Sequence, residues 1–496
     1  MKKTKIKKGH VRLSKQDTLR VRVSVFLILP VLLGMIACLK QKSDIEKVGI
    51  AGENRTVLPV NQVLEPAGIQ VALPGLRPQA LALSPNGRLL AVSGKTNELL
   101  IIDPEKTEIN QTVDFPSEDQ NEPPPATSSA NILNPDKAGQ LSYTGLIFSH
   151  SGDRIYLSNV NGSIKVFSVA PDGKVLPSHS IPLPDAEAPR RKKQIPAGLA
   201  LSGDGQKLYV CGNLSNQLLE IDIPTNQVIR TFDVGVAPYD VVLLNGKAYV
   251  SNWGGRRPEP GDLTGPAGRG TVVKVDPIRH IANEGSVSVI DLFSGTTKEI
   301  LVHLHSSALA VSPDGRYIVC ANAASDNLSV IDAQTDTIVE TIWVKGSPAD
   351  LFGASPNALC FSPDGKRLYV ANGTQNAVAV VHFAPEEGES TMLGLIPVGW
   401  FPGALSFDVK NQKLCVANIK GHPVDPQEYK PTGGKGFNTH HYHGSVSLVP
   451  VPDIDELQRL TEAAYENFRR ERITLALKEA RPDQPLRPIP ERIGEP

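Results

Sequence analysis

One phrase recurs seven times between Ala80 and Pro452, and it constrains the fold more than any other feature of the sequence. Its clearest copies are Ser306–Trp343 (SSALAVSPDGRYIVCANAASDNLSVIDAQTDTIVETIW) and Pro356–Phe383 (PNALCFSPDGKRLYVANGTQNAVAVVHF). Each copy reads as an apolar strand, a Ser-Pro-Asp-Gly turn, a second apolar strand ending in Ala-Asn, an alternating strand, a tight turn and a final strand. Pro-Asp-Gly between apolar runs supplies the positive φ angles that tight hairpins need. A recurrence of about 40 residues with four strands per copy predicts an all-β, seven-bladed β-propeller with four-stranded blades, because one such sheet cannot bury both faces alone.

The five more divergent copies keep the same frame. They begin at Ala80, Tyr143, Ala197, Pro238 and Gly403, with third strands predicted at Glu98–Asp103, Ser163–Val169, Gln217–Asp222, Gly285–Asp291 and Gly444–Val449. The last copy reaches only its third strand. We therefore expect Gly68–Leu73 (GIQVAL), which precedes the first copy, to pair with Ser445–Val449 and so remove two open sheet edges.

The propeller predicted for residues 57–452 is flanked by segments of other kinds. Residues 1–38 resemble an export signal, and 39–56 form a linker. Residues 453–480 are predicted to form an α-helix, in which Leu457, Leu460, Ala464 and Phe468 share one apolar face, and 481–496 form a Pro-rich tail. The formal net charge is -1, so no basic field favours nucleic acid as a partner.

The N-terminus indicates export to the cell envelope. The first 22 residues are rich in Lys and Arg, and Val23–Ala37 is an uncharged run of 15 residues, shorter than the ~20 residues of a typical membrane-spanning helix. Met35-Ile36-Ala37-Cys38 resembles a bacterial lipobox, which would make Cys38 a lipid-modified first residue and a membrane anchor in the periplasm or on the outer surface. Plain secretion is the alternative, and the long basic region also fits a start site assigned too far upstream.

The sequence predicts no cofactor. Cys211, Cys320, Cys360 and Cys415 each lie in an apolar strand of a different blade, without a Cys-x-x-Cys or a haem-attachment motif, so we expect buried thiols.

The long loops are expected on one face of the propeller. Turns from first to second strand are short, whereas the long segments are blade-to-blade connections or second-to-third loops, which return to the face where each first strand starts. These segments are Pro116–Ser142, Asp185–Pro196, Gly254–Glu284, Lys345–Ser355 and Ile419–His443. Loops of this length are usually functional or disordered; the first looks disordered, and the insertions of blades four and seven look more ordered.

Those two insertions and one connection supply the candidate ligand-binding residues, with packing of the loops as the alternative role. Trp253 beside Arg256 and Arg257 can stack on a planar ligand and grip an anion. His440, His441 and His443 lie within four residues, but no carboxylate or Cys partner supports a metal site. The candidates are Asn252, Trp253, Arg256, Arg257, Trp400, His440, His441 and His443.

An Asn closes most second strands: Asn159, Asn252, Asn322, Asn372 and Asn418. We expect its side chain to cap the following turn by bonding nearby backbone. A ring of Asn that coordinates a cation on the axis is the alternative.

The copies Tyr369–Asn372 (YVAN), Tyr249–Asn252 (YVSN) and Cys415–Asn418 (CVAN) resemble the YVTN repeat family of exported bacterial seven-bladed propellers, over residues 57–452. Ser251–Asp262, Val275–Leu292, Val398–Phe407 and Gly444–Asp453 more narrowly resemble the propeller half of bacterial surface proteins whose other half is an alkaline-phosphatase-like phosphoesterase. That resemblance implies a separate phosphoesterase partner. No hydrolase domain follows here, so we expect neither phosphodiesterase nor phosphomonoesterase activity.

Three functions are consistent with these features. The leading interpretation is a non-catalytic binding or docking module that presents its loop-rich face to a ligand or protein. The alternative is a lactonase-like hydrolase of small esters, disfavoured because no acidic residue stands at the first-strand starts Ala80, Thr144, Ala197, Tyr239, Ser307, Asn357 and Gly403. A periplasmic partner of redox or metal proteins is the third, weakened by the missing haem motif.

Overall fold

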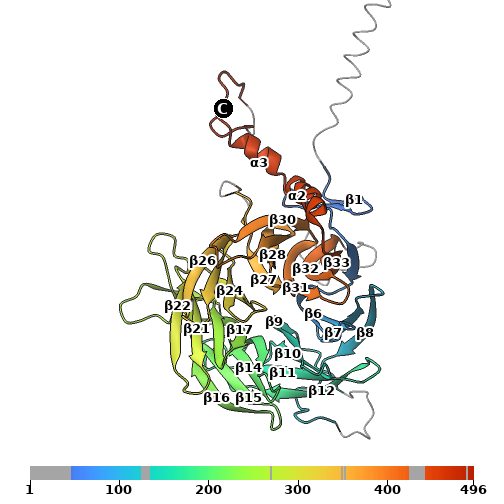
Figure 1. The fold of residues 1–496 in the computed structure, drawn as a ribbon, viewed down its shortest axis with the longest axis vertical. Coiled ribbons are helices and arrows are strands. Elements are labelled where there is room, and N and C mark those ends of the chain that lie inside the picture. Colours follow the sequence, from blue (N-terminus) through green and yellow to red (C-terminus); the bar gives the residue numbers. More distant parts are fainter. Residues whose placement is uncertain are drawn as a thin grey trace, which may run out of the picture. The chain divides into compact units, whose positions relative to one another are not determined.

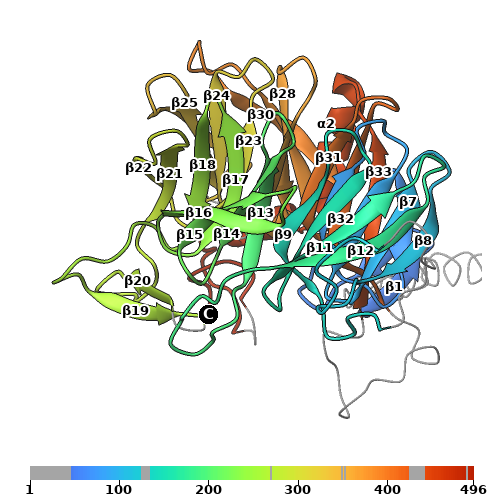
Figure 2. The same ribbon diagram turned by 90° about the horizontal axis from the view of Figure 1, so that it is seen from below.

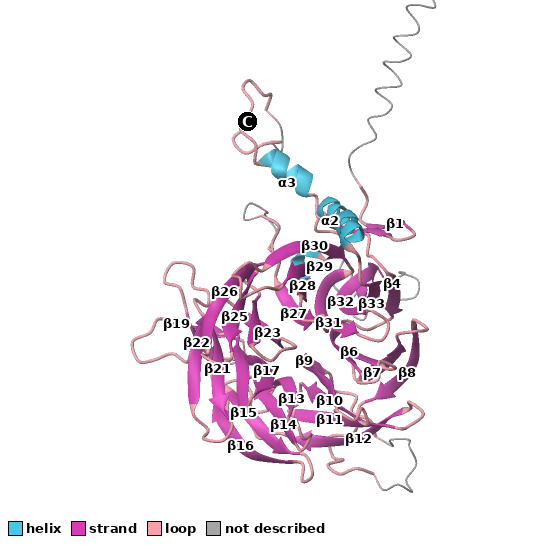
Figure 3. Ribbon diagram, viewed as in Figure 1, coloured by secondary structure: helices cyan, strands magenta, loops and turns pink. Residues whose placement is uncertain are grey.

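The computed structural model describes residues 46–124, 134–268, 271–347, 350, 353–423, 442–486 and 490–496. The chain divides into two units, 1–48 and 49–496, and the second unit contains the folded domain. Within the described residues, seven four-stranded antiparallel sheets are arranged around one axis (Figure 1). Figure 3 shows that this domain is built almost entirely of strands. The predicted seven-bladed propeller is confirmed.

The blades follow one another along the chain. Blade one contains β5 (Pro78–Leu83), β6 (Leu90–Gly94), β7 (Glu98–Asp103) and β8 (Glu108–Asp114); blade two, β9 (Leu141–Phe148), β10 (Arg154–Asn159), β11 (Ser163–Val169) and β12 (Val175–Pro182); blade three, β13 (Pro196–Leu201), β14 (Lys207–Gly212), β15 (Gln217–Asp222) and β16 (Gln227–Asp233); blade four, β17 (Pro238–Leu244), β18 (Lys247–Asn252), β21 (Gly285–Asp291) and β22 (Thr297–Val302). Blade five contains β23 (Ser306–Val311), β24 (Tyr317–Asn322), β25 (Asn327–Asp332) and β26 (Thr337–Trp343); blade six, β27 (Pro356–Phe361), β28 (Arg367–Asn372), β29 (Ala377–His382) and β30 (Thr391–Pro397); blade seven, β31 (Trp400–Asp408), β32 (Lys413–Pro423), β33 (Tyr442–Pro450) and β4 (Ile69–Leu73).

The mixed blade seven closes the ring as predicted. β4 pairs antiparallel with β33, from Ile69 opposite Leu448 to Leu73 opposite Gly444. Gly68, just before β4, has a φ of +69°, and a Cβ there would lie 2.4 Å from the carbonyl oxygen of Leu448. β4 is therefore held against β33 next to Gly68, a position that only glycine can occupy without strain.

The hairpin turns have the chemistry that the repeat predicts. In blade five, Ser312 Oγ donates to Asp314 Oδ1 at 2.5 Å and accepts the Tyr317 N–H at 2.9 Å, while Gly315 has a φ of +68°. The same Ser–Asp bond recurs in blade six between Ser362 and Asp364, at 2.6 Å.

The hydrophobic core lies between the blades. Buried residues of the described chain form seven layers, each shared by two neighbouring blades. Cys211, Cys320 and Cys415 are buried in these layers as free thiols, as expected, and Cys360 is partly buried. Each sheet thus covers both of its faces with its neighbours, which one sheet alone cannot do.

The C-terminal helix packs on the rim of the propeller but is shorter than predicted. α2 (Ile454–Asn467) lies against β30, and its Leu457 and Ala464 are buried. The chain turns at Arg469, whose φ is +61°, and resumes as α3 (Arg470–Ala476), which buries no residue. The helix predicted for 453–480 is therefore present as two helices, interrupted where Phe468 is buried in the core beside blades five and six and the chain turns. No helix among the described residues has the length and apolar character to span a membrane.

The face on which the inner strands begin, which we name the loop face, carries the long connections. The blade-four insertion contains the hairpin β19 (Thr264–Ala267) and β20 (Thr271–Lys274), which stands away from the blade sheets in Figure 2. A small sheet of β1 (Gly49–Gly52), β2 (Arg55–Val57) and β3 (Val63–Leu64) precedes the propeller and is tied to blade six, where Gln62 Nε2 donates to the Thr374 carbonyl oxygen at 3.0 Å.

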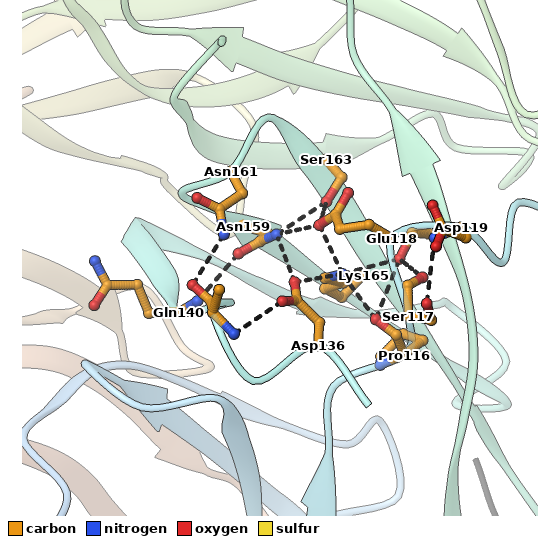
Figure 4. A network of polar contacts seen from close by, with 12 residues as sticks. Pro116, Ser117, Glu118, Asp119, Asp136, Gln140, Asn159, Asn161, Ser163 and Lys165 are labelled. Atoms are coloured by element: carbon orange, nitrogen blue, oxygen red, sulfur yellow. Dashed lines mark hydrogen bonds and ion pairs between the residues drawn. The ribbon is translucent and has the colours of Figure 1, made fainter. Parts of the chain in front are cut away.

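The connection between blades one and two is anchored, in contrast to the predicted disorder of Pro116–Ser142. Lys165 of β11 is completely buried, and its Nζ lies 2.7 Å from Glu118 Oε1 and 2.9 Å from Asp136 Oδ2 (Figure 4). It also donates to the Pro116 carbonyl oxygen at 2.8 Å. Both described ends of this connection therefore converge on one buried cation, which the strand pattern alone could not reveal. The residues between them, 125–133, lie outside the described part.

Candidate functional site

A cavity of about 340 Å³ opens on the loop face at the inner ends of blades two to four. We name it the mouth pocket. The described residues that line it are Tyr143, Ile195, Asn213, Leu214, Ala237, Tyr239, Trp253, Ala267, Gly268 and Thr271. They come from inner-strand starts, from the loops beside them and from the β19–β20 hairpin. The volume falls in the range of pockets that hold one small molecule.

Two tyrosines form one wall of the mouth pocket. The rings of Tyr143 and Tyr239 meet edge to face, with centroids 5.7 Å apart, and the Tyr143 hydroxyl donates to Asn213 Oδ1 at 3.3 Å. Burial, together with the Asp240 carboxylate, raises the pKa of Tyr239, so its hydroxyl stays protonated at neutral pH. No hydrogen bond within the described chain uses this hydroxyl, which leaves it able to donate to a ligand.

Trp253, one of the candidate ligand-binding residues from the sequence, also lines the mouth pocket. Its side chain is 38% exposed, and its indole stacks on the imidazole of His305 with centroids 4.3 Å apart and an angle of 24°. His305 does not line the pocket, so it supports the indole from behind. Burial lowers the pKa of His305, and the stacked imidazole is therefore neutral at pH 7.

Three residues at the mouth have a left-handed backbone conformation. Tyr143 and His305 have φ angles of +53° and +54°, and Ala237 has +56°. Such angles are uncommon for residues other than glycine and gather at functional sites. They turn the chain into the inner strands and hold these side chains at the mouth.

The two arginines of the insertion are engaged within the protein. Arg256 forms a two-pronged ion pair with Glu284, at 2.9 and 3.3 Å. Arg257 donates to the carbonyl oxygens of Val234 and Asn216 at 2.7 and 2.5 Å. These contacts hold the insertion against blades three and four, and neither arginine lines the mouth pocket.

The other predicted residues that the structure describes do not line this pocket. Asn252 is buried inside blade four. Trp400 begins β31, where its ring meets Tyr442 edge to face at 5.1 Å and Lys420 Nζ lies 4.8 Å from its centroid. His443 is in β33, opposite His422 of β32. His440, His441 and Cys38 lie outside the described residues.

Two of the second-strand asparagines bond to serines of their own blades. Asn252 Nδ2 donates to the hydroxyls of Ser286 and Ser288 at 3.0 and 2.8 Å, and Asn418 Nδ2 donates to those of Ser445 and Ser447 at 3.2 and 2.8 Å. Both amides are completely buried. In these two blades the amide protons go to serines on the third strand and not to the backbone of the following turn, so the expected cap is wrong there. Asn372 comes nearer to the expectation, because its Nδ2 donates to the Val344 carbonyl oxygen at 2.7 Å and to Gln375 in the following turn at 2.9 Å.

One acidic residue at the inner strands escaped the sequence analysis. β17 has an irregular register between Pro238 and Asp240, and Asp240 lies one residue beyond the position inspected in the sequence. Its Oδ1 accepts the N–H of Val241 and its Oδ2 accepts that of Leu309 in blade five, both at 2.9 Å. Burial raises the pKa of Asp240 to about 6. The objection to a hydrolase, that no carboxylate stands at an inner-strand start, is therefore wrong. The signal was present in the sequence, since the corresponding residues of other blades are small.

A larger cavity, of about 400 Å³, lies among hairpin turns of blades one and two. Turn residues such as Asn86, Arg88 and Asp153 line it. Asp153 Oδ1 accepts two hydroxyl protons within its own turn, from Ser149 and Ser151. This cavity is thus a groove between turns, without aromatic walls.

Comparisons with known proteins agree with the architecture. The family model described as lactonase, 7-bladed beta-propeller, matches residues 273–395, from β20 to β30. No curated protein matches the chain. The match covers about a quarter of the chain.

Solved structures give the same fold at low identity. Hydrazine synthase of Kuenenia stuttgartiensis has a TM-score of 0.50 and 16% identity, over 70% of this chain and 94% of that one. U3-55K has a TM-score of 0.53 and 12% identity, over 78% and 98%. A candidate 6-phosphogluconolactonase of Bacteroides fragilis has a TM-score of 0.46 and 18% identity, over 66% and 86%. The observed sheets and the matching family model support one conclusion: the chain is a seven-bladed β-propeller.

Proposed function

We propose that the protein is a hydrolase of small cyclic esters, which it binds in the mouth pocket. The observation that carries the proposal is the cavity itself: about 340 Å³, walled by three aromatic side chains, at an inner-strand mouth that also holds the carboxylate of Asp240. The match to the lactonase family model over residues 273–395 supports the same class of chemistry.

The walls suit a ring-shaped substrate. Aromatic faces stack on flat or weakly polar rings, and the protonated hydroxyl of Tyr239 would donate to the ester carbonyl, whose oxygen gains negative charge in the transition state. In the reaction, water adds to the carbonyl carbon, the ring C–O bond breaks, and the departing oxygen takes a proton. A lactone and water thus give one hydroxy acid, with no other reactant.

A binding module without turnover is the second candidate, and one observation favours it. Among the described residues that line the mouth pocket, none is an acid, a basic side chain or a hydroxyl nucleophile paired with a base. The same pocket would then hold a ligand, or a protein segment, that is not converted. The partnership with a separate phosphoesterase, implied by the family resemblance, belongs to this candidate.

Ring opening of a lactone panel separates the two candidates. Purified protein is incubated with γ-butyrolactone, glucono-δ-lactone and dihydrocoumarin, and acid release is followed in a weakly buffered solution. A hydrolase gives saturable turnover, which falls at least tenfold in Trp253→Ala and Tyr239→Phe. Saturable binding by calorimetry without turnover assigns the binding module. The absence of both binding and turnover refutes the lactone class.

We further propose that the protein is exported and anchored through lipid on Cys38. The basic start, the apolar run Val23–Ala37 and the lipobox-like Met35–Cys38 support this. In a bacterial host, wild type should sediment with membranes and Cys38→Ala should move to the soluble fraction. Equal sedimentation of both would refute acylation as the anchor.

A further inference from the structure

Asp240 is an exception to the repeat at its position. In register it faces Ser251 of the second strand, and the residues in the same register of blades one, six and seven are Ala80, Ala358 and Ala404. In all four blades, the register between the first and second strands shifts just before this residue, after a proline in the first strand. The fold therefore accepts a methyl group here, and the carboxylate is not needed to build a blade.

The carboxylate joins two inner strands. Oδ1 accepts the N–H of Val241 in its own strand β17, and Oδ2 accepts the N–H of Leu309 in β23, both at 2.9 Å. A second link lies beside it, since Ser251 Oγ accepts the Asp240 N–H at 3.1 Å and donates to the Ser307 carbonyl oxygen at 2.5 Å. Blades four and five are thus connected at the mouth through Asp240.

The first of these strands supplies a wall residue of the mouth pocket, and the second begins directly after the residue that supports another. Tyr239, the residue before Asp240, lines the pocket directly. His305 immediately precedes β23 and supports the indole of Trp253 at 4.3 Å. The contact from Asp240 to Leu309 therefore fixes the distance between the strand of Tyr239 and the strand that supports Trp253.

Among the titratable groups that sense the charge of Asp240, none titrates near neutral pH as Asp240 does. Cys211 of β14 and Cys320 of β24 lie near enough to sense its charge, and so does Tyr239. Burial raises the pKa of all three, so they remain neutral at pH 5 to 8. Gly198 of β13 packs against the Asp240 backbone and carries no charge.

We propose that Asp240 is a positioning residue, which in its ionised form holds the Tyr239 and Trp253 walls at the spacing that the ligand requires. The inference rests on the proposed function, because it concerns the same pocket. A protonated carboxyl group can no longer accept both N–H groups equally well. The pocket should therefore bind its ligand at pH 7.5 and lose affinity as the pH falls through about 6.

The test combines ligand affinity with amide exchange in the full-length protein. Dihydrocoumarin is the probe, and its dissociation constant is measured by calorimetry at pH 5.0 and 7.5 in wild type, Asp240→Ala and Asp240→Asn. Wild type should bind at least tenfold more weakly at pH 5.0. Asp240→Ala should bind as weakly at both pH values, because it lacks the carboxylate at either. The alanines at this register in three other blades show that the fold accepts this substitution.

Amide exchange tests the positioning itself without a ligand. At pH 7.5, Asp240→Ala should exchange the Leu309 amide at least tenfold faster than wild type and should loosen the Tyr239 segment, while melting no earlier. The control is Asp332→Ala, since Asp332 also accepts two backbone N–H groups, of Gln334 and Thr335, but in a turn. It should leave affinity and its pH dependence unchanged.

The outcomes separate this inference from the proposed function. If wild type binds none of the three lactones of the panel, the lactone class is wrong, and exchange at Leu309 alone decides the role of Asp240. Unchanged exchange in Asp240→Ala, or unchanged affinity with the wild-type pH dependence, overturns the positioning role.

Discussion

Replacing Lys165 by methionine should destabilise the propeller strongly, although the position is far from the mouth pocket. Lys165 is completely buried, with its Nζ 2.7 Å from Glu118 and 2.9 Å from Asp136. Methionine keeps the apolar stem and removes the cation. Glu118 is 35% exposed and can turn to water, whereas Asp136 is 7% exposed and would be left as an unpaired buried charge.

The size of the loss follows from that difference. Removing one partner of a buried ion pair costs about 3–5 kcal/mol, and the mobile Glu118 places the expected loss near the lower end, at about 3 kcal/mol. Burial alone would raise the pKa of Asp136, but the hydrogen bond and charge of Lys165 hold it below the ordinary value of 3.8. This stabilisation is therefore present above that value and is lost as the pH falls through the lower folded pKa.

Urea unfolding at pH 7 measures the effect. Lys165→Met combined with Asp136→Asn should recover most of the lost stability, because the stranded charge is gone. The control is Lys410→Met, whose side chain is 54% exposed and whose partner Glu105, 3.4 Å away, is 74% exposed; it should cost less than about 1 kcal/mol. A loss below 1 kcal/mol in Lys165→Met, or no recovery in the double variant, would refute the reasoning.

Three further predictions follow from individual contacts. Gly68→Ala should weaken the closure between β4 and β33, since a Cβ would lie 2.4 Å from the Leu448 carbonyl oxygen, and faster amide exchange in Ile69–Leu73 would show it. Arg257→Ala removes donors to the Val234 and Asn216 carbonyl oxygens, so limited proteolysis within 253–284 should speed up while the melting temperature changes little. The pKa of Asp240 is about 6 in the folded protein and 3.8 in the unfolded chain, so the native state retains a proton that the unfolded chain has lost. The free energy of unfolding should therefore fall by about 3 kcal/mol as the pH rises from 4 to 7. Urea unfolding across this range should show the fall in wild type and not in Asp240→Ala.

The fold was largely predictable because its determinants are local. Ser-Pro-Asp-Gly turns fix each hairpin, and the four predicted third strands of blades one to four coincide with β7, β11, β15 and β21. The closure by β4 followed from counting strands. The segment beyond the propeller was predicted as one continuous helix because its interruption depends on where Phe468 is buried, which periodicity does not encode.

The site was only partly predictable because its walls come from distant parts of the chain. Trp253 stood out beside the insertion, whereas Tyr143 and Tyr239 looked like ordinary inner-strand residues until the blades were placed side by side. Asp240 was missed by one residue, and only an alignment of the copies on Pro238 and the corresponding prolines shows it against small residues. The buried ion pairs of Lys165 could not be predicted either, because its partners Glu118 and Asp136 lie on a connection without a repeat pattern.

The location of a bound lactone tests the central claim most directly. A crystal structure of the protein soaked with dihydrocoumarin, or with its ring-opened acid, should show the ligand between Tyr143, Tyr239 and Trp253, with its carbonyl or carboxylate oxygen within hydrogen-bonding distance of the Tyr239 hydroxyl. A ligand found instead in the groove lined by Asn86 and Arg88, or an empty mouth pocket at a concentration that saturates turnover, would contradict the account.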